Sequence, residues 1–139
     1  MNNMGEPRIK ILAMPKDTNP SGNIFGGWIM SQIDVAGALA SRDANVNRVV
    51  TVAVNAMEFH EPIFVGDTVS FYAKIIKIGK TSLKTIVEVT AERLFKNTRR
   101  CVHVTSATFT YVAVDEDGIK QIIDCTKNHR LALGIKDDE

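Results

Sequence analysis

The segment SGNIFGGWIMSQIDVAG, residues 21–37, consists mainly of glycine and apolar residues and contains one acidic residue, Asp34. From Gly27 to about Asp43 the residues favour helix and no proline interrupts them, which predicts a helix of roughly 25 Å. Apolar residues cover nearly the whole circumference of this helix, so we expect it to be buried on all sides. Small residues at positions 36–38 and 40 indicate that another element packs close to the helix axis.

The sequence on either side of this helix predicts strands. Residues 8–14 alternate charged and apolar side chains, as one strand would, and residues 15–23 are rich in turn-forming residues. After the helix, alternation and β-branched residues predict four long strands, at 48–59, 68–79, 82–95 and 99–114. Short turns suit antiparallel hairpins in meander-like succession. The predicted class is α+β, with an antiparallel sheet wrapped around the helix. Since one helix leaves a sheet face and the sheet edges exposed, we expect the chain to assemble.

Length and composition limit the classes of protein. The 139 residues correspond to one domain, expected at 1–139 with a core at about 8–118 and a peripheral tail at 119–139. A formal net charge of +1 gives no reason to expect a nucleic-acid or membrane partner. The N-terminus does not resemble a signal peptide and no apolar stretch is long enough to span a membrane, so a cytoplasmic location is expected. The two cysteines lack metal-site spacing, which is typical of a reduced, intracellular protein.

The start of the predicted helix is a candidate anion site. Gly26 and Gly27 stand where the first backbone N–H groups of the helix have no internal partner. Together with the helix dipole, these amides could form an oxyanion hole for acyl transfer. The pair on its own favours the simpler interpretation, tight packing at a bend, because short glycine motifs often occur by chance.

Asp34 raises a separate question, because an acid among apolar side chains is costly unless it is paired or functional. It lies eight residues after Gly26, about 12 Å along the axis, too far to serve the same helix end. Two antiparallel helices at a dimer interface would bring each Asp34 near the other's N-terminus. The simpler alternative is an internal salt bridge or a hydrogen bond to a Ser or Thr hydroxyl. Asn19, just ahead, is either a turn residue or the holder of a water or carbonyl.

Other candidate residues carry weaker signals. His60 lies beside Glu58 and Glu61, but the spacing fits no zinc motif and favours a structural role. The serines lack a hydrolase nucleophile context, and no dinucleotide or phosphate-loop motif is present. We therefore expect neither a metal site nor a cofactor.

A longer pattern carries a resemblance to a known family. The arrangement D-x-N-x-x-G-x-x-x-G-G-x-x-x-x-x-x-D occurs as Asp17, Asn19, Gly22, Gly26, Gly27 and Asp34. With the segments FHEPIFVGD (59–67) and GKTS (79–82), it resembles the hotdog-fold acyl-CoA thioesterases, and most nearly the small YciA-like bacterial acyl-CoA hydrolases. The resemblance covers roughly residues 8–118.

This resemblance implies a five-stranded antiparallel sheet around a central helix, and a homodimer whose sheets join, with active sites at the interface. A hexamer, as a trimer of dimers, is the expected assembly. The implied reaction is hydrolysis of acyl-CoA to CoA and a carboxylic acid, with Asp34 as general base or nucleophile. The Gly26 N–H, with Gly27 beside it, would polarise the carbonyl, and Asn19 would orient water or substrate opposite Asp34 of the partner subunit. The implied CoA contacts are Gly79, Lys80, Thr81 and Ser82.

Two departures from the family pattern narrow the prediction. Phe25 stands where many hotdog thioesterases have His before the glycine pair, which favours the acyl-CoA hydrolase branch over the phenylacetate-type branch. Ala38 stands where some relatives have a hydroxyl, which argues against a mechanism that needs it. Two alternatives remain: a hotdog hydratase or dehydratase, which would usually need a His near the acid, and a non-catalytic acyl-CoA binding or sensing protein.

Overall fold

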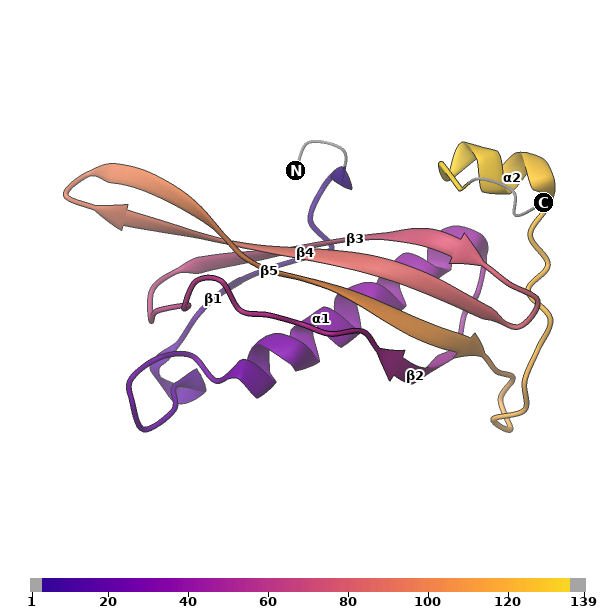
Figure 1. The fold of residues 1–139 in the computed structure, drawn as a ribbon, viewed down its shortest axis with the longest axis horizontal. Coiled ribbons are helices and arrows are strands. Elements are labelled where there is room, and N and C mark those ends of the chain that lie inside the picture. Colours follow the sequence, from indigo (N-terminus) through magenta and orange to yellow (C-terminus); the bar gives the residue numbers. More distant parts are fainter. Residues whose placement is uncertain (1–3, 136–139) are drawn as a thin grey trace.

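The computed structural model describes residues 4–135 of the chain, and within them one antiparallel sheet is crossed by one long helix (Figure 1). The main elements, in chain order, are β1 (Ile9–Leu12), α1 (Gly26–Ser41), β2 (Val49–Val54), β3 (Thr68–Ile78), β4 (Ser82–Phe95), β5 (Thr98–Ala113) and α2 (Lys127–Ala132). The order of the five strands in the sheet is β1-β3-β4-β5-β2. The predicted α+β class, antiparallel sheet and central helix are confirmed.

The prediction that the four later strands follow one another as a meander is only partly right. β3, β4 and β5 are consecutive neighbours, but β2 pairs with β5 and forms the sheet edge opposite β1. After β2 the chain continues beside β5, where the Asn55 N–H donates to the Thr108 carbonyl and the His60 N–H to the Val104 carbonyl. It then passes the start of α1, where the Ile24 N–H donates to the Ile63 carbonyl, and reaches β3. This path follows from the backbone pairing of β2 and the residues after it with β5. The turn residues of the sequence do not reveal that pairing.

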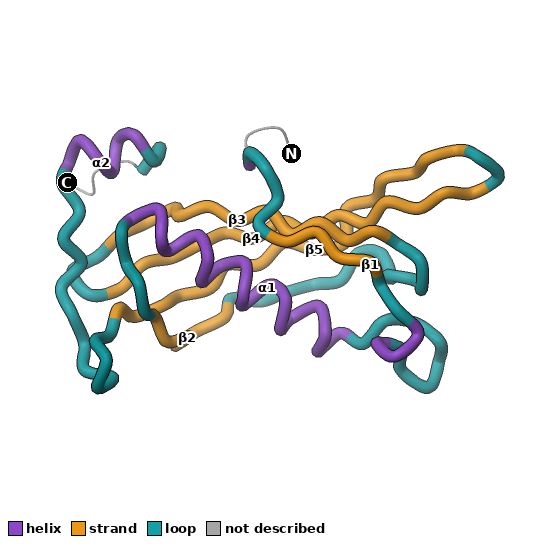
Figure 2. Tube along the Cα trace, turned by 180° about the vertical axis from the view of Figure 1, so that it is seen from behind, coloured by secondary structure: helices purple, strands orange, loops and turns teal. Residues whose placement is uncertain are grey.

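The prediction that α1 is buried on all sides is wrong for the single chain. Figures 1 and 2 show the helix lying against one face of the sheet only. Met30 and Val35, two large apolar residues of the helix, are 42% and 49% exposed. One sheet can cover only one side of a helix, so the apolar residues on the other side remain uncovered in the single chain.

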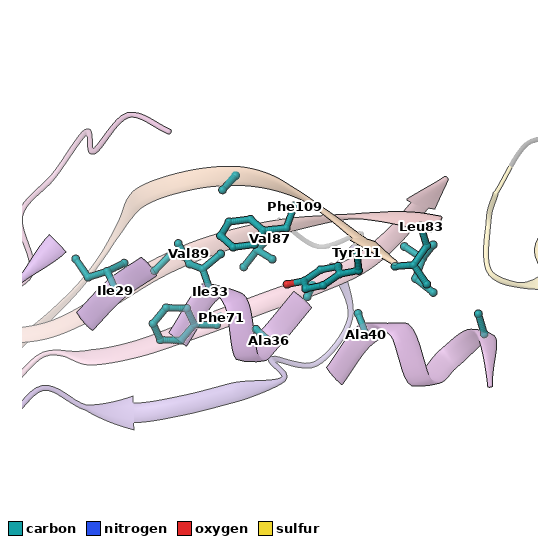
Figure 3. Packing of buried hydrophobic residues seen from close by; sticks show 14 of the residues in the cluster. Ile29, Ile33, Ala36, Ala40, Phe71, Leu83, Val87, Val89, Phe109 and Tyr111 are labelled. Atoms are coloured by element: carbon teal, nitrogen blue, oxygen red, sulfur yellow. The ribbon is translucent and has the colours of Figure 1, made fainter. Parts of the chain in front are cut away.

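The core lies between α1 and the concave face of the sheet. Figure 3 shows Ile29, Ile33, Ala36 and Ala40 of the helix facing large side chains of the strands. Those side chains include Phe71, Leu83, Val87, Val89, Phe109 and Tyr111. Each fully buried aliphatic or aromatic side chain contributes about 1.5–3 kcal/mol through the hydrophobic effect, so this contact fixes how α1 lies on the sheet.

Gly37 is the point of closest approach between α1 and the sheet. The ring of Tyr111 and the hydroxyl of Thr85 occupy the space beside its Cα. This confirms the prediction that the small residues of the helix allow a close neighbour, which β4 and β5 supply through Thr85 and Tyr111.

β2 is an uncovered edge strand. Among the described residues, β2 pairs with β5 on one side and with no strand on the other. Three of its valines, Val50, Val52 and Val54, are 45%, 55% and 42% exposed. An apolar edge strand with unpaired backbone groups is a ready site for pairing with another chain, in agreement with the expectation that the chain assembles.

The tail returns along the end of the sheet. The Ile123 N–H donates to the Lys80 carbonyl at 2.8 Å, and Nε2 of His129 in α2 lies 2.7 Å from the Asp43 carbonyl. Residues 136–139 of the predicted domain lie outside the described residues. In the part of the chain that is described, no helix combines the length and the apolar character needed to cross a membrane.

Replacing Gly37 by alanine is expected to destabilise the protein by about 1–2 kcal/mol. The new methyl group would overlap the Tyr111 hydroxyl and lie 2.8 Å from Thr85 Oγ1. Overpacking of this kind costs about 1–3 kcal/mol, which the better helix propensity of alanine offsets only in part. Urea unfolding measures the change. Gly27→Ala is the matched control, because a methyl group there meets nothing within 4 Å, and it should be at least as stable as the native chain.

Candidate active site

Asp34 lies near the middle of α1 and is held by two hydroxyl groups. Its Oδ1 accepts hydrogen bonds from Thr51 Oγ1 at 2.7 Å and from the Tyr111 hydroxyl at 3.0 Å. The Tyr111 hydroxyl also lies 2.9 Å from the main-chain carbonyl oxygen of Asp34. Thus the acid has hydroxyl partners, one of the two alternatives that the sequence left open, and no cation within residues 4–135 forms a salt bridge with it.

The two hydroxyl donors bind only one of the two oxygens of the Asp34 carboxylate. Among the described residues, both side-chain hydrogen bonds to it end on Oδ1. Oδ2 therefore remains available to accept a hydrogen bond from water or to attack a ligand. Asp34 as a whole is only partly buried.

Tyr111 is fully buried, and its environment disfavours ionisation. Burial, first, and then the negative charge of Asp34 and the hydrogen bond to it raise the pKa of the Tyr111 phenol far above its ordinary value, while Thr85 has a smaller opposite effect. A raised pKa means that the neutral phenol is the stable form. Tyr111 therefore stays a hydrogen-bond donor across the pH range in which enzymes work.

The start of α1, the candidate anion site of the sequence, lies beside a cavity of about 350 Å³. Gly26 and Asn19 contribute to its wall, together with Ile29 and the loop 59–63. The N–H groups of the first helical turn have no partner within the helix and carry its positive dipole end. The cavity therefore offers amide donors beside apolar surface, a suitable combination for a carbonyl attached to an acyl chain.

The loop before α1 holds Asn19 in place. Asn19 Oδ1 accepts from the Ser21 N–H at 2.9 Å and from the Asn23 N–H at 3.2 Å. Gly22, at φ +89°, takes the left-handed conformation that glycine adopts at little cost. Because Oδ1 closes the turn, the Nδ2 group is the part of the side chain left for a ligand. The two alternatives considered for Asn19, turn residue and ligand contact, are therefore compatible.

The structure brings Asn19 and Gly26 together but not Asp34. Asp34 is absent from the cavity wall, and eight residues of helix correspond to about 12 Å along the axis. Gly79, Lys80 and Thr81 form the β3–β4 turn, near the end of the sheet where α1 finishes and far from the cavity (Figure 1). One chain therefore carries the predicted site residues in separate groups.

Sequence reasoning missed two residues of this region. Thr51 and Tyr111 are opposite each other in the β2–β5 pairing, a relation between distant segments that no local motif reveals. His60, assigned a structural role, lines the cavity and stacks on His103 with ring centroids 5.9 Å apart. Within residues 4–135, no three His, Cys, Asp or Glu side chains gather in a way that could hold a metal ion.

Comparison with known proteins gives consistent results. The model of the Thioesterase superfamily matches residues 21–94. An uncharacterized acyl-CoA thioester hydrolase of Haemophilus influenzae is 46% identical over 130 residues, which cover 91% of this chain and 83% of the relative. The acyl-CoA thioester hydrolase YciA of Salmonella typhimurium is 45% identical over 115 residues, 82% of this chain and 86% of the relative.

Solved structures extend the likeness to three dimensions. A hexameric hotdog-fold thioesterase of Campylobacter jejuni superimposes with a TM-score of 0.88 and is 50% identical. The superposition covers 95% of this chain and 98% of that one.

Proposed function

This chain belongs to the thioesterase superfamily and has the hotdog fold, and from this premise we propose that it hydrolyses acyl-CoA thioesters to CoA and a carboxylic acid. The names of its relatives support this substrate class. The proposal rests on one observation: the two groups that the reaction needs lie apart within a single chain. An amide-lined cavity opens at the start of α1, and a hydroxyl-bound carboxylate lies about 12 Å along the same helix.

A homodimer would complete this site. Antiparallel pairing of two β2 edges would join the sheets and cover the exposed Val50, Val52 and Val54. The two α1 helices would then lie antiparallel. Asp34 of each chain would come near the helix N-terminus of the other. A trimer of such dimers is the proposed larger assembly, by analogy with the hexameric C. jejuni thioesterase.

The roles of the residues follow from their chemistry. The Gly26 N–H, with Gly27 beside it, donates a hydrogen bond to the thioester carbonyl oxygen and stabilises the oxyanion that forms there. Asn19 Nδ2 orients the water or the carbonyl from the same side. Oδ2 of Asp34, from the partner subunit, faces the carbonyl carbon. Apolar residues of the cavity, including Ile24, Ile29 and Ile63, accommodate the start of the acyl chain.

The carboxylate can act in either of two ways. As a general base, Asp34 takes a proton from water while the water oxygen attacks the carbonyl carbon. The C–S bond then breaks, CoA leaves as a thiolate that gains a proton, and the carboxylic acid remains. As a nucleophile, Asp34 itself attacks, CoA leaves, and water hydrolyses the resulting anhydride. Both routes use the same oxygen and give the same products.

The β3–β4 turn is the proposed contact for the CoA portion of the substrate. In the antiparallel dimer, the turn of one chain, beyond the C-terminal end of its α1, lies toward the side where the partner's α1 begins. The Lys80 side chain is exposed there and could pair with a phosphate. Gly79, Thr81 and Ser82 would approach the ligand through backbone and hydroxyl groups.

Asp34→Ala is expected to lower acyl-CoA hydrolysis by about 100-fold or more, because it removes the only carboxylate proposed to act on the substrate. Release of free thiol from acetyl- to palmitoyl-CoA measures the rate. Asp117→Ala, in an exposed turn, is the control and should hydrolyse as fast as the native protein. Native protein that binds acyl-CoA but releases no thiol would instead indicate a binding or sensing protein.

Lys80→Ala is expected to raise KM for acyl-CoA about twofold to fivefold, the effect of losing one exposed ion pair. kcat should not change, because the phosphate contact is the same in the ground and transition states. Added salt should reduce the difference between variant and native protein. Lys10→Ala, on the β1 edge, is the control. An unchanged KM at low salt would show that Lys80 of this turn does not contact the CoA portion of the substrate.

A further inference from the structure

We propose that Tyr111 is a positioning residue for the carboxylate, holding Asp34 so that Oδ2 points out of the chain toward the other half of the site. This inference rests on the proposed function, because it assigns a role relative to Asp34. No motif of the sequence singles out Tyr111, which lies 77 residues from Asp34 in the chain.

The first argument is the geometry of the contact. The Tyr111 hydroxyl lies 3.0 Å from Oδ1 and 2.9 Å from the main-chain carbonyl oxygen of the same aspartate. It thus ties the carboxylate to a fixed point on the helix backbone. A half-exposed aspartate on a helix otherwise exchanges between rotamers. With Oδ1 held, the carboxylate loses much of that freedom, and Oδ2 is the oxygen that neither hydroxyl group occupies.

The second argument is the register of the sheet. Thr51 of β2 and Tyr111 of β5 are directly opposite partners, so their side chains project from the same face. Thr51 Oγ1 donates to the same Oδ1 at 2.7 Å. Two adjacent strands thus supply two donors that converge on one oxygen. The register shift that follows Thr51 in the β2–β5 pairing lies next to this pair.

The third argument is the space made for the phenol. Figure 3 shows the Tyr111 hydroxyl turned toward α1, level with the segment between Ala36 and Ala40. A side chain at position 37 would overlap this hydroxyl, so only glycine lets the phenol reach the Asp34 carbonyl. Tyr111 is fully buried, and the raised pKa of its phenol keeps the proton available for donation. The neighbourhood of Tyr111 is thus arranged to keep a neutral donor against the helix.

Tyr111→Phe tests the proposal, because it keeps the ring and removes only the hydroxyl. We expect kcat for acyl-CoA hydrolysis to fall about 10- to 100-fold, the usual worth of a hydrogen bond to a charged group, with KM unchanged. Tyr72→Phe is the matched control: Tyr72 lies on the opposite face of the sheet, on β3, and its variant should keep the native rate. A native kcat in Tyr111→Phe would overturn the proposal.

A double-mutant cycle separates positioning from general structural support. If Tyr111 acts through the carboxylate, Tyr111→Phe causes no further loss in an Asp34→Asn background. If it only supports the fold, the loss is the same in both backgrounds, and the proposal is wrong. Thr51→Val removes the other hydroxyl donor to Oδ1, so the same cycle with Asp34→Asn tests whether holding that oxygen supports catalysis should Tyr111→Phe fold poorly. Failure of the proposed function would look different: the native protein would release no thiol, or Asp34→Asn alone would hydrolyse acyl-CoA at the native rate.

Discussion

A single sheet can cover only one side of a helix, although α1 carries apolar residues on most of its circumference. The rest of this structure depends on which residues of α1 the sheet covers and which it leaves exposed. Residues such as Ile33 and Ala36 pack into the concave face of the sheet, and Gly37 lets β5 approach the helix backbone. Met30 and Val35 of the helix stay exposed, as do Val50, Val52 and Val54 of the edge strand β2. The fold thus leaves apolar side chains uncovered on α1 and β2, the two elements that also carry Asp34 and its donor Thr51.

This arrangement explains why an acid lies in an apolar helix. Asp34 is on the flank of α1 where β2 and β5 can supply hydroxyl donors, so its burial is compensated without a cation. The same helix begins at a cavity with amide donors, but a rigid helix cannot bring its own middle to its own start. A second copy running in the opposite direction can, and both proposed sites of a dimer are then formed by one interface.

Much of this could be predicted from the sequence where the signal is local. Alternation and turn residues predicted β4 at its observed bounds and β3 and β5 within a residue. The resemblance to the hotdog thioesterases implied that Asn19 and Gly26 of one chain act together, and both residues line one cavity. Signals that depend on long-range pairing were missed. The edge position of β2, and the meeting of Thr51 and Tyr111 opposite Asp34, follow from sheet register. The exposed side of α1 was missed because an apolar interface and a core have the same composition.

The most direct test of the central claim, that each active site combines groups from two chains, is to mix two inactive variants. Asn19→Ala and Asp34→Ala proteins are unfolded together in equal amounts, refolded, and assayed for thiol release from acyl-CoA. If Asn19 of one chain works with Asp34 of the other, random pairing makes mixed dimers with one intact site each, and about a quarter of the native activity returns. If both residues serve a site within one chain, every site carries a lesion and the mixture stays inactive, which would contradict the claim.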